Sequence, residues 1–535
     1  MDPRLIDRLR TDLDAADYRV EAVRGLLGAE ADDARLRGVF APARRALAAR
    51  RPGALGALIR VFLLGDAVDD AVLAAALPGL GVSGAERLGL VARGSGQSDL
   101  RAVLALNPVR ISEDPGLPAP VDWWIISDLD DQLRRGPARP DHVMGVGGAT
   151  RSLIAQLPAG GPASSPDLGG ADMPGALDLG TGCGIVALHL SLRGPVLATD
   201  ISARALLFAE ANAGLNGVTG AIEFREGDLF APAAGERFAL IASNPPFVVT
   251  PRRGAGEARY EYRDGGLVGD ALAERVVREA PRHLADDGTL ICLANWESHW
   301  GRDGLARVRE WIVEAADGLP TAQLAGWVIE RDRVSPERYA ETWARDGGAR
   351  VGEPEFDALM DDWLADFAAR RVTSLGLGSI RIRRLAADAS ASRALALRSE
   401  QAAGAYSAAA GAHLESAFDA AIETSRLSDA EMLSRCWVLD DAVEEHREHR
   451  PGQEAPRAIS LSTDAGIARR VSADPLLAAA VGACDGELDL GQIADALASL
   501  LELDAAEVAD ALVSGVRELV WLGMLAPQPT SGDVE

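Results

Sequence analysis

Apolar residues in the first part of the chain recur every three or four positions. Leu5, Ile6, Leu9 and Leu13 begin this pattern, which continues to about residue 90 and predicts amphipathic helices. Two strand-like runs follow, at 100–106 and 122–127. Helices followed by strands predict a small α+β, winged-helix-like module, which we assign to residues 1–118.

Short apolar runs alternate with amphipathic stretches in the middle of the chain. Because parallel strands joined by helices are covered on both faces, they appear in a sequence as continuous apolar segments. Such segments lie at 175–179, 196–199, 222–224, 239–242 and 289–293. This pattern predicts an α/β fold, a doubly wound Rossmann-like domain over residues 119–385 that closes with strands near 327–329 and 374–382.

The pattern becomes helical again beyond residue 385. We therefore expect a mainly helical C-terminal domain over residues 386–535. Its final segments, 493–500, 507–519 and 520–522, are compatible with a second winged-helix-like unit.

Composition narrows the possible partners. A formal net charge of -26 opposes attraction of the whole chain to nucleic acid or to an acidic membrane. The four cysteines are far apart and form no CxxC pair, which predicts no metal site and a reducing compartment. No window approaches the ~18 apolar residues that a membrane span needs, and the N-terminus lacks an apolar signal core. We expect a cytoplasmic protein with no membrane partner.

A glycine-rich turn joins the first central strand to the next helix. Its sequence is Asp178-Leu-Gly-Thr-Gly-Cys-Gly184. Glycines let the backbone turn sharply and let a ligand approach without a Cβ in the way. The spacing differs from the Gly-x-Gly-x-x-Gly of dinucleotide enzymes, and no P-loop is present. The turn predicts a nucleotide-like cofactor.

Acidic residues also end the next two predicted strands. Asp200 stands about twenty residues further on, where an acid typically binds ribose hydroxyls. Asp228 ends the third strand, where its carboxylate can accept a hydrogen bond from an adenine amine while Leu229 and Phe230 cover the ring. The three strand ends together predict an adenosine-containing cofactor.

Asn244-Pro-Pro-Phe247 follows the buried run at 238–243. Two successive prolines cannot continue a helix or donate to a sheet, so the tetrapeptide predicts a rigid turn at the end of a strand. Such a turn can hold a side-chain amide, a backbone carbonyl and an aromatic face in fixed relation. This arrangement suits the binding of a flat –NH2 group.

These residues, in this order, resemble the class I S-adenosylmethionine-dependent methyltransferases. The likeness covers roughly residues 141–384 and is greatest to the small-domain group, which contains HemK-type glutamine methyltransferases and several adenine and guanine amine methyltransferases. It implies S-adenosylmethionine as cofactor and Asn244, Pro245, Pro246 and Phe247 as the catalytic turn. The implied cofactor-binding residues are Asp178, Gly180, Thr181, Gly182, Gly184, Asp200, Ile201, Asp228, Leu229 and Asn244.

The implied reaction is methyl transfer to a planar –NH2. The sulfonium carbon of the cofactor is already activated, so the protein need only align a nitrogen for in-line displacement. Asn244 Oδ1 and the Pro245 carbonyl would accept both N–H groups and stabilise charge developing on the nitrogen. Phe247 would stack on the planar group. Two loops are expected nearby, 141–150 beside the methionine end of the cofactor and 260–270 over the substrate.

The turn alone does not choose among glutamine, adenine and guanine amines. Val248 stands where guanine-specific members often carry His, which favours a glutamine in a release-factor-like protein. The alternative acceptor is an adenine or guanine in RNA or DNA. It is favoured by an arginine-rich stretch from 34 to 65 that contains no acidic residue, although a solvated helical face would also explain this stretch. That stretch contains Arg35, Arg37, Arg44, Arg45, Arg50 and Arg51. A third hypothesis is a cofactor-binding regulator without catalysis.

Overall fold

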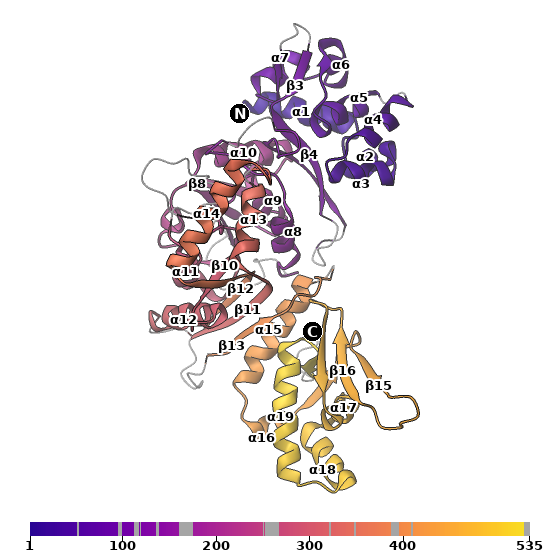
Figure 1. Ribbon diagram of the computed structural model, residues 1–535, viewed down its shortest axis with the longest axis vertical. Coiled ribbons are helices and arrows are strands. Elements are labelled where there is room, and N and C mark those ends of the chain that lie inside the picture. The colour runs from indigo at the N-terminus through magenta and orange to yellow at the C-terminus, as the bar shows by residue number, and fades with distance from the viewer. Residues whose placement is uncertain are drawn as a thin grey trace.

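Three parts follow one another along the long axis of the molecule (Figure 1). A computed structural model describes residues 1–50, 53–94, 99–111, 117, 119–134, 139–159, 175–249, 251, 267–319, 323–346, 349–386, 395–407 and 410–528. No helix within these ranges is both long enough and apolar enough to cross a membrane.

The N-terminal module is helical with a small sheet, as predicted. Its helices are α1 (Pro3–Ala15), α2 (Val20–Leu27), α3 (Ala29–Leu36), α4 (Ala41–Ala48), α5 (Gly53–Leu58), α6 (Asp70–Ala76) and α7 (Gly81–Arg87), and a π-helical turn spans Ile59–Leu63. Strands β1 (Val68–Asp69), β2 (Val91–Arg93) and β3 (Asp99–Ala102) form an antiparallel sheet in the order β1-β3-β2.

A β-hairpin leads from this module into the centre of the chain. Strand β4 (Leu104–Ile111) pairs along its whole length with the antiparallel strand β5 (Val121–Asp128). The boundary that we proposed near residue 118 therefore falls between two paired strands. The β4–β5 hairpin therefore belongs to both the N-terminal module and the central domain.

The central domain is built on an eight-stranded sheet. The order is β13-β11-β12-β10-β9-β6-β7-β8, with β12 antiparallel to both of its neighbours. The strands are β6 (Ala176–Leu179), β7 (Val196–Asp200), β8 (Ile222–Glu226), β9 (Phe238–Ser243), β10 (Leu284–His299), β11 (Gln323–Val334), β12 (Val372–Leu385) and β13 (Leu397–Gln401). The helices around it are α8 (Gly148–Ala155), α9 (Ile185–Leu190), α10 (Ala203–Leu215), α11 (Ala271–Glu279) and α12 (Gly304–Asp317).

Both faces of this sheet are buried, which confirms the doubly wound α/β prediction. Ile291 and Leu293 of β10 belong to one hydrophobic cluster, and the alternating Leu290 and Cys292 belong to another on the opposite face. Strand order reverses at β6, because β7 and β8 lie on one side of it and β9 and β10 on the other. Ligands of open α/β sheets bind beyond the carboxyl ends of the strands at such a reversal.

A helical hairpin that the pattern did not predict separates β11 from β12. Helices α13 (Pro336–Asp346) and α14 (Pro354–Ala369) pack against residues that follow the Asn244 turn. Buried Val248 and Val249 share one hydrophobic cluster with Tyr339 of α13 and Trp363 of α14. The hairpin therefore covers one side of the predicted catalytic turn.

The C-terminal part contains more strand than we predicted. Its helices are α15 (Ala410–Ser425), α16 (Asp429–Leu433), α17 (Pro475–Val481), α18 (Leu490–Leu501) and α19 (Ala505–Trp521). Two antiparallel sheets accompany them, β15-β16-β17 and β18-β14-β19. Their strands are β14 (Cys436–Leu439), β15 (Glu444–Glu448), β16 (Ala458–Thr463), β17 (Arg469–Ala473), β18 (Asp485–Asp489) and β19 (Leu525–Pro527). Strand β13 also follows the boundary proposed at 386, yet it extends the central sheet.

Asn212 of α10 and Asn216, which follows the end of this helix, bind β5 as a neighbouring strand would. Asn212 accepts a hydrogen bond from the Ile126 amide at 2.8 Å and donates to the Ile126 carbonyl at 2.9 Å. Asn216, one turn later, makes the same pair of bonds with Trp124 at 2.9 and 2.8 Å. The Asn212 amide also donates to the Cys183 carbonyl in the glycine-rich turn at 2.8 Å. One buried side chain thus joins the N-terminal hairpin to the turn.

We predict that Asn212→Ala lowers the free energy of unfolding by about 3 kcal/mol, because it leaves buried backbone groups of Ile126 and Cys183 without their partner. Urea denaturation followed by tryptophan fluorescence measures the change. Asn216→Ala is the control, with an expected loss of about 1 kcal/mol because this side chain is only partly buried. Equal stability of Asn212→Ala and the unmodified protein would contradict the assigned role.

Candidate functional site

Asp178 lies beneath the glycine-rich turn and organises it. The side chain is 1% exposed, and its Oδ2 accepts hydrogen bonds from Thr181 Oγ1 at 2.6 Å and from the Ala187 amide at 2.9 Å. Burial raises the pKa of this carboxyl to about 7. Asp178 therefore closes the turn onto the start of α9 from below.

The three glycines of the turn have two different environments. All have positive φ, +78° at Gly180, +56° at Gly182 and +86° at Gly184. A Cβ on Gly184 would lie 2.9 Å from the Cβ of Ala209 on α10, so this position needs glycine for close helix packing. A Cβ on Gly180 or Gly182 would meet no described atom within 4 Å. These two residues face open space, where a ligand can approach the backbone.

Asp200 is the last residue of β7, and it also binds the glycine-rich turn. Its Oδ2 accepts a hydrogen bond from the Gly182 amide and its Oδ1 from the Ser202 amide, both at 2.9 Å. Both oxygens of Asp200 thus bind backbone amides at this strand end. The next residue, Ile201, is 63% exposed and offers an apolar surface at the same strand end.

Asp228 follows β8 and points toward α11. Its Oδ2 accepts a hydrogen bond from Arg275 Nη1 at 2.8 Å, and about half of the side chain is exposed. Leu229 has a φ of +45° and is partly buried. Phe230 packs in the core instead, stacked on His283 with ring centroids 4.7 Å apart. Of the two residues that we expected to cover an adenine ring, only Leu229 is placed at the strand end.

The Asn244 turn is anchored to β6 and α8. Ser243 Oγ donates a hydrogen bond to the Leu179 carbonyl at 2.8 Å. Asn244 Nδ2 donates to Thr150 Oγ1 at 3.1 Å, so the expected loop at 141–150 does reach the turn. Asn244 Oδ1 is buried and has no hydrogen-bond partner among the described residues. Since an unpaired buried acceptor costs about 1–3 kcal/mol, this atom marks a place where a donor belongs.

Aromatic residues surround the second half of the turn. Pro245 is buried, and Phe247 is half-buried with its ring edge-on to Trp343 of α13 at 6.5 Å between centroids. Tyr339 of α13 accepts a hydrogen bond from the Val249 amide. The sequence analysis assigned no role to Thr150, Tyr339 or Trp343, although the four-residue spacing of the two aromatic residues was a signal for one helix face. Residues 260–266 of the substrate loop expected at 260–270 lie outside the described residues.

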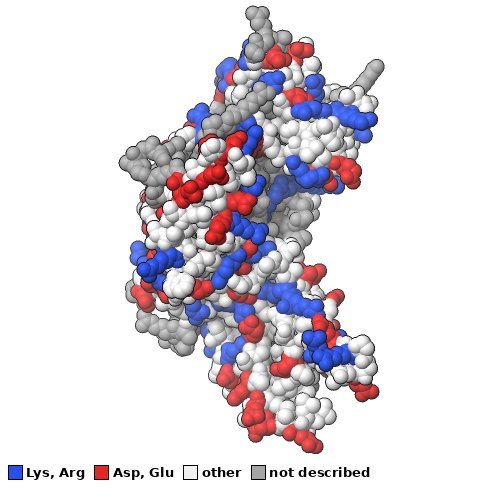
Figure 2. Space-filling view, viewed as in Figure 1, with Lys and Arg blue, Asp and Glu red and all other residues white. Residues whose placement is uncertain are grey.

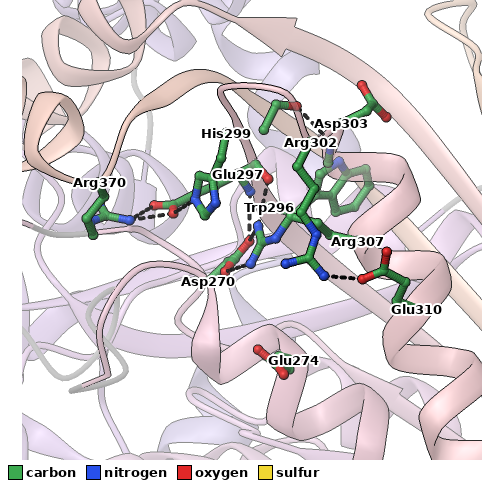
Figure 3. A network of polar contacts seen from close by, with 12 residues as sticks. Asp270, Glu274, Trp296, Glu297, His299, Arg302, Asp303, Arg307, Glu310 and Arg370 are labelled. Carbon is green, nitrogen blue, oxygen red and sulfur yellow. Dashed lines mark hydrogen bonds and ion pairs between the residues drawn. The ribbon is translucent and has the colours of Figure 1, made fainter.

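A network of paired charges lies around the end of β10 (Figure 3). Asp270 lines a cavity of about 10 Å³ together with Pro246 and Phe247, and its carboxylate accepts hydrogen bonds from both terminal nitrogens of Arg307. Glu297, which is 1% exposed, pairs with Arg370 and lies 2.9 Å from His299 Nε2. These buried carboxylates have cationic partners, as buried charges require. The network braces the end of β10 against α11, α12 and α14.

Two arginines of the basic stretch in the N-terminal module pair with acidic residues. Arg35 pairs with Asp32 at 2.7 Å, and Arg44 pairs with Asp66 at 2.8 Å. Arg50 donates hydrogen bonds to backbone carbonyls of α2. Arg37 and Arg45 are exposed, while Arg51 lies outside the described residues.

Comparison with known proteins gives two family matches. Residues 166–303 match the methyltransferase small domain, and residues 15–103 match a domain of unknown function (DUF7059).

Two curated relatives are glutamine methyltransferases. The ribosomal protein uL3 glutamine methyltransferase of Bradyrhizobium diazoefficiens is 38% identical over 152 residues, which is 27% of this chain and 44% of that protein. The release factor glutamine methyltransferase of Xylella fastidiosa (strain Temecula1) is 41% identical over 169 residues, or 30% of this chain and 58% of that protein. The chain thus spans about half the length of these curated relatives.

One solved structure is a ribosomal protein L11 methylase from Lactobacillus delbrueckii subsp. bulgaricus. It aligns with 44% of this chain and 80% of its own at 18% identity, with a TM-score of 0.23, which is too low to add weight. The family match at 166–303 is the stronger finding. It includes β6 and β9, the two strands that precede the glycine-rich turn and Asn244. The central part of the chain therefore matches the methyltransferase small domain and is similar to glutamine methyltransferases, which supports the resemblance to the HemK-like group of class I S-adenosylmethionine-dependent methyltransferases.

Proposed function

We propose that this protein methylates the side-chain amide nitrogen of a glutamine in another protein, with S-adenosylmethionine as the methyl donor. The observation that carries the proposal is the buried, unpaired Asn244 Oδ1 at the carboxyl end of β9. An acceptor –NH2 supplies the donor that this oxygen lacks. The turn that holds it is rigid because of its two prolines.

The described residues fit the cofactor. Gly180 and Gly182 expose backbone without a Cβ, and Asp200 binds the Gly182 amide next to the exposed Ile201. Asp228 and Leu229 stand at the next strand end. When bound, the cofactor supplies a methyl group already activated by its sulfonium. The remaining work of the protein is alignment of the acceptor nitrogen.

The acceptor amide requires help because its nitrogen lone pair is delocalised into the carbonyl. Asn244 Oδ1 and the Pro245 carbonyl would accept the two N–H hydrogens and stabilise positive charge that develops on the nitrogen. Phe247 would lie against the planar group. Thr150 binds the NH2 end of Asn244 and so keeps the oxygen end directed to the acceptor.

Names of relatives and surface charge both favour a protein acceptor. The two curated relatives are named for ribosomal protein uL3 and for release factor. From Pro475 to Val516 the chain has eight acids and no basic residue, and in Figure 2 the end of the molecule that carries α18 is red and white. Such a surface repels phosphate backbones. An adenine or guanine acceptor is the second candidate, favoured by exposed Arg37 and Arg45.

Transfer of labelled methyl groups to separated protein, RNA and DNA fractions tests the acceptor class. We expect label in a protein, released on hydrolysis as N-methylglutamine-derived methylamine. Label in RNA or DNA alone would contradict the proposal and support the second candidate. Cofactor binding without transfer to any fraction would support the regulator hypothesis.

We predict that Asn244→Ala lowers the rate of methyl transfer by at least about 100-fold, because the principal acceptor for the reacting –NH2 is removed. Calorimetry with S-adenosylmethionine is the control, and the affinity should change little because Asp200 and the glycine-rich turn are intact. Unchanged transfer by this variant would refute the role of Asn244.

We predict that Thr150→Val lowers kcat by about 10- to 100-fold, because the unpaired Asn244 amide can then rotate and misplace its oxygen. Thr150→Ser keeps a hydroxyl at the same position and should retain most of the activity. Steady-state kinetics with the acceptor fraction identified above measures both variants. Equal activity of the Val and Ser variants would show that Thr150 does not orient Asn244.

A further inference from the structure

We propose that helix α13 holds the acceptor turn in its reactive geometry, with Tyr339 as the positioning residue and Trp343 as a wall of the acceptor site. The inference rests on the proposed function and adds residues outside the stretch that matches the methyltransferase small domain, 166–303. It assigns a task to the α13–α14 hairpin, which the sequence did not predict.

Tyr339 joins the acceptor turn to the neighbouring strand. Its hydroxyl accepts one hydrogen bond from the Val249 amide at 3.0 Å and one from Asn295 Nδ2 of β10 at 2.8 Å. The side chain is 1% exposed. Val249 stands two residues after Phe247, at a point where the chain has left β9. A single phenol oxygen therefore replaces the strand pairing that the turn has lost.

Trp343 extends the same contact toward the acceptor. It lies four residues after Tyr339, and residues at this spacing share one helix face. Its ring meets Phe247 at a centroid distance of 6.5 Å and an interplanar angle of 68°. An edge-to-face contact restricts the tilt of the Phe247 ring, which is the ring proposed to lie against the acceptor. Tyr339 and Trp343 thus contact two positions in and just after the turn, Val249 and Phe247, from one face of α13.

The hairpin is rigid enough to serve this purpose. The Tyr339 ring packs against the rings of Trp363 and Phe367, with centroid distances of 5.7 and 6.0 Å. The rings of these two α14 residues are themselves 5.8 Å apart between centroids. Burial also raises the pKa of the Tyr339 phenol above its ordinary value. The neutral hydroxyl keeps its two acceptor positions throughout the ordinary pH range.

Tyr339→Phe in the full-length protein separates positioning from packing. The substitution keeps the ring and removes only the oxygen that holds Val249 and Asn295. We expect amide exchange at residues 247–249 to become about tenfold faster while exchange in β6 and β9 is unchanged. The kcat for methyl transfer should fall about tenfold, with the KM for S-adenosylmethionine unchanged. Purified ribosomal protein uL3 and release factor serve as acceptor probes.

Trp363→Phe is the matched control, because it disturbs the same aromatic cluster but leaves both hydrogen bonds in place. Its exchange at 247–249 and its kcat should stay close to those of the unmodified protein. Trp343→Ala should raise the KM for the acceptor several-fold with both Tyr339 hydrogen bonds intact.

Unchanged exchange in Tyr339→Phe, or an equal increase in Trp363→Phe, would overturn the proposal. Exchange and cofactor binding are measured without an acceptor. They therefore decide the role of Tyr339 even if neither acceptor probe is methylated, whereas absence of transfer by the unmodified protein bears on the proposed function alone.

Discussion

A buried hydrogen-bonding group that lacks a partner costs about 1–3 kcal/mol, and this constraint organises the whole carboxyl end of the central sheet. At the ends of β6 and β9 and in the first turn of α9, backbone polar groups lack partners in regular structure. Side chains replace them. Asp178 binds the Ala187 amide, Ser243 binds the Leu179 carbonyl and Tyr339 binds the Val249 amide. Two buried side-chain oxygens at these strand ends, Asn244 Oδ1 and Thr199 Oγ1 of β7, have no such partner among the described residues.

The same constraint connects the N-terminal module to the site. Asn212 satisfies both backbone groups of Ile126 in the hairpin and, with its second N–H, the Cys183 carbonyl of the glycine-rich turn. The hairpin and the glycine-rich turn are therefore joined through a single side chain, without any intervening loop. This direct bond gives a physical reason for an N-terminal module on a methyltransferase domain, apart from any contact of its own with a substrate.

The conformation of short segments could be predicted from the sequence, whereas the packing between distant segments could not. The run from Asp178 to Gly184 predicts its own conformation, because glycines at positive φ and a strand before a helix are local properties. Phe230 was misjudged because the chain direction after Asp228 decides whether the ring faces the ligand or His283. The α13–α14 hairpin shows aromatic residues at helical spacing, but nothing in that spacing names Val249 or Phe247 as their partners. Strand β13 likewise pairs with β11, seventy residues earlier, which no local pattern specifies.

The groups proposed to act on the acceptor, Asn244, the Pro245 carbonyl and Phe247, carry no charge and do not titrate. Among the described residues, two carboxylates near the turn are paired with arginines, Asp270 with Arg307 and Glu297 with Arg370. A free carboxylate beside the acceptor could bind its N–H groups and compete with Asn244. Pairing these two charges with arginines is consistent with the proposal that alignment of the acceptor supplies the rate enhancement. A site of this kind suits a planar –NH2 whose proton is lost only after the methyl group has arrived, because no base needs to be held ready at the turn.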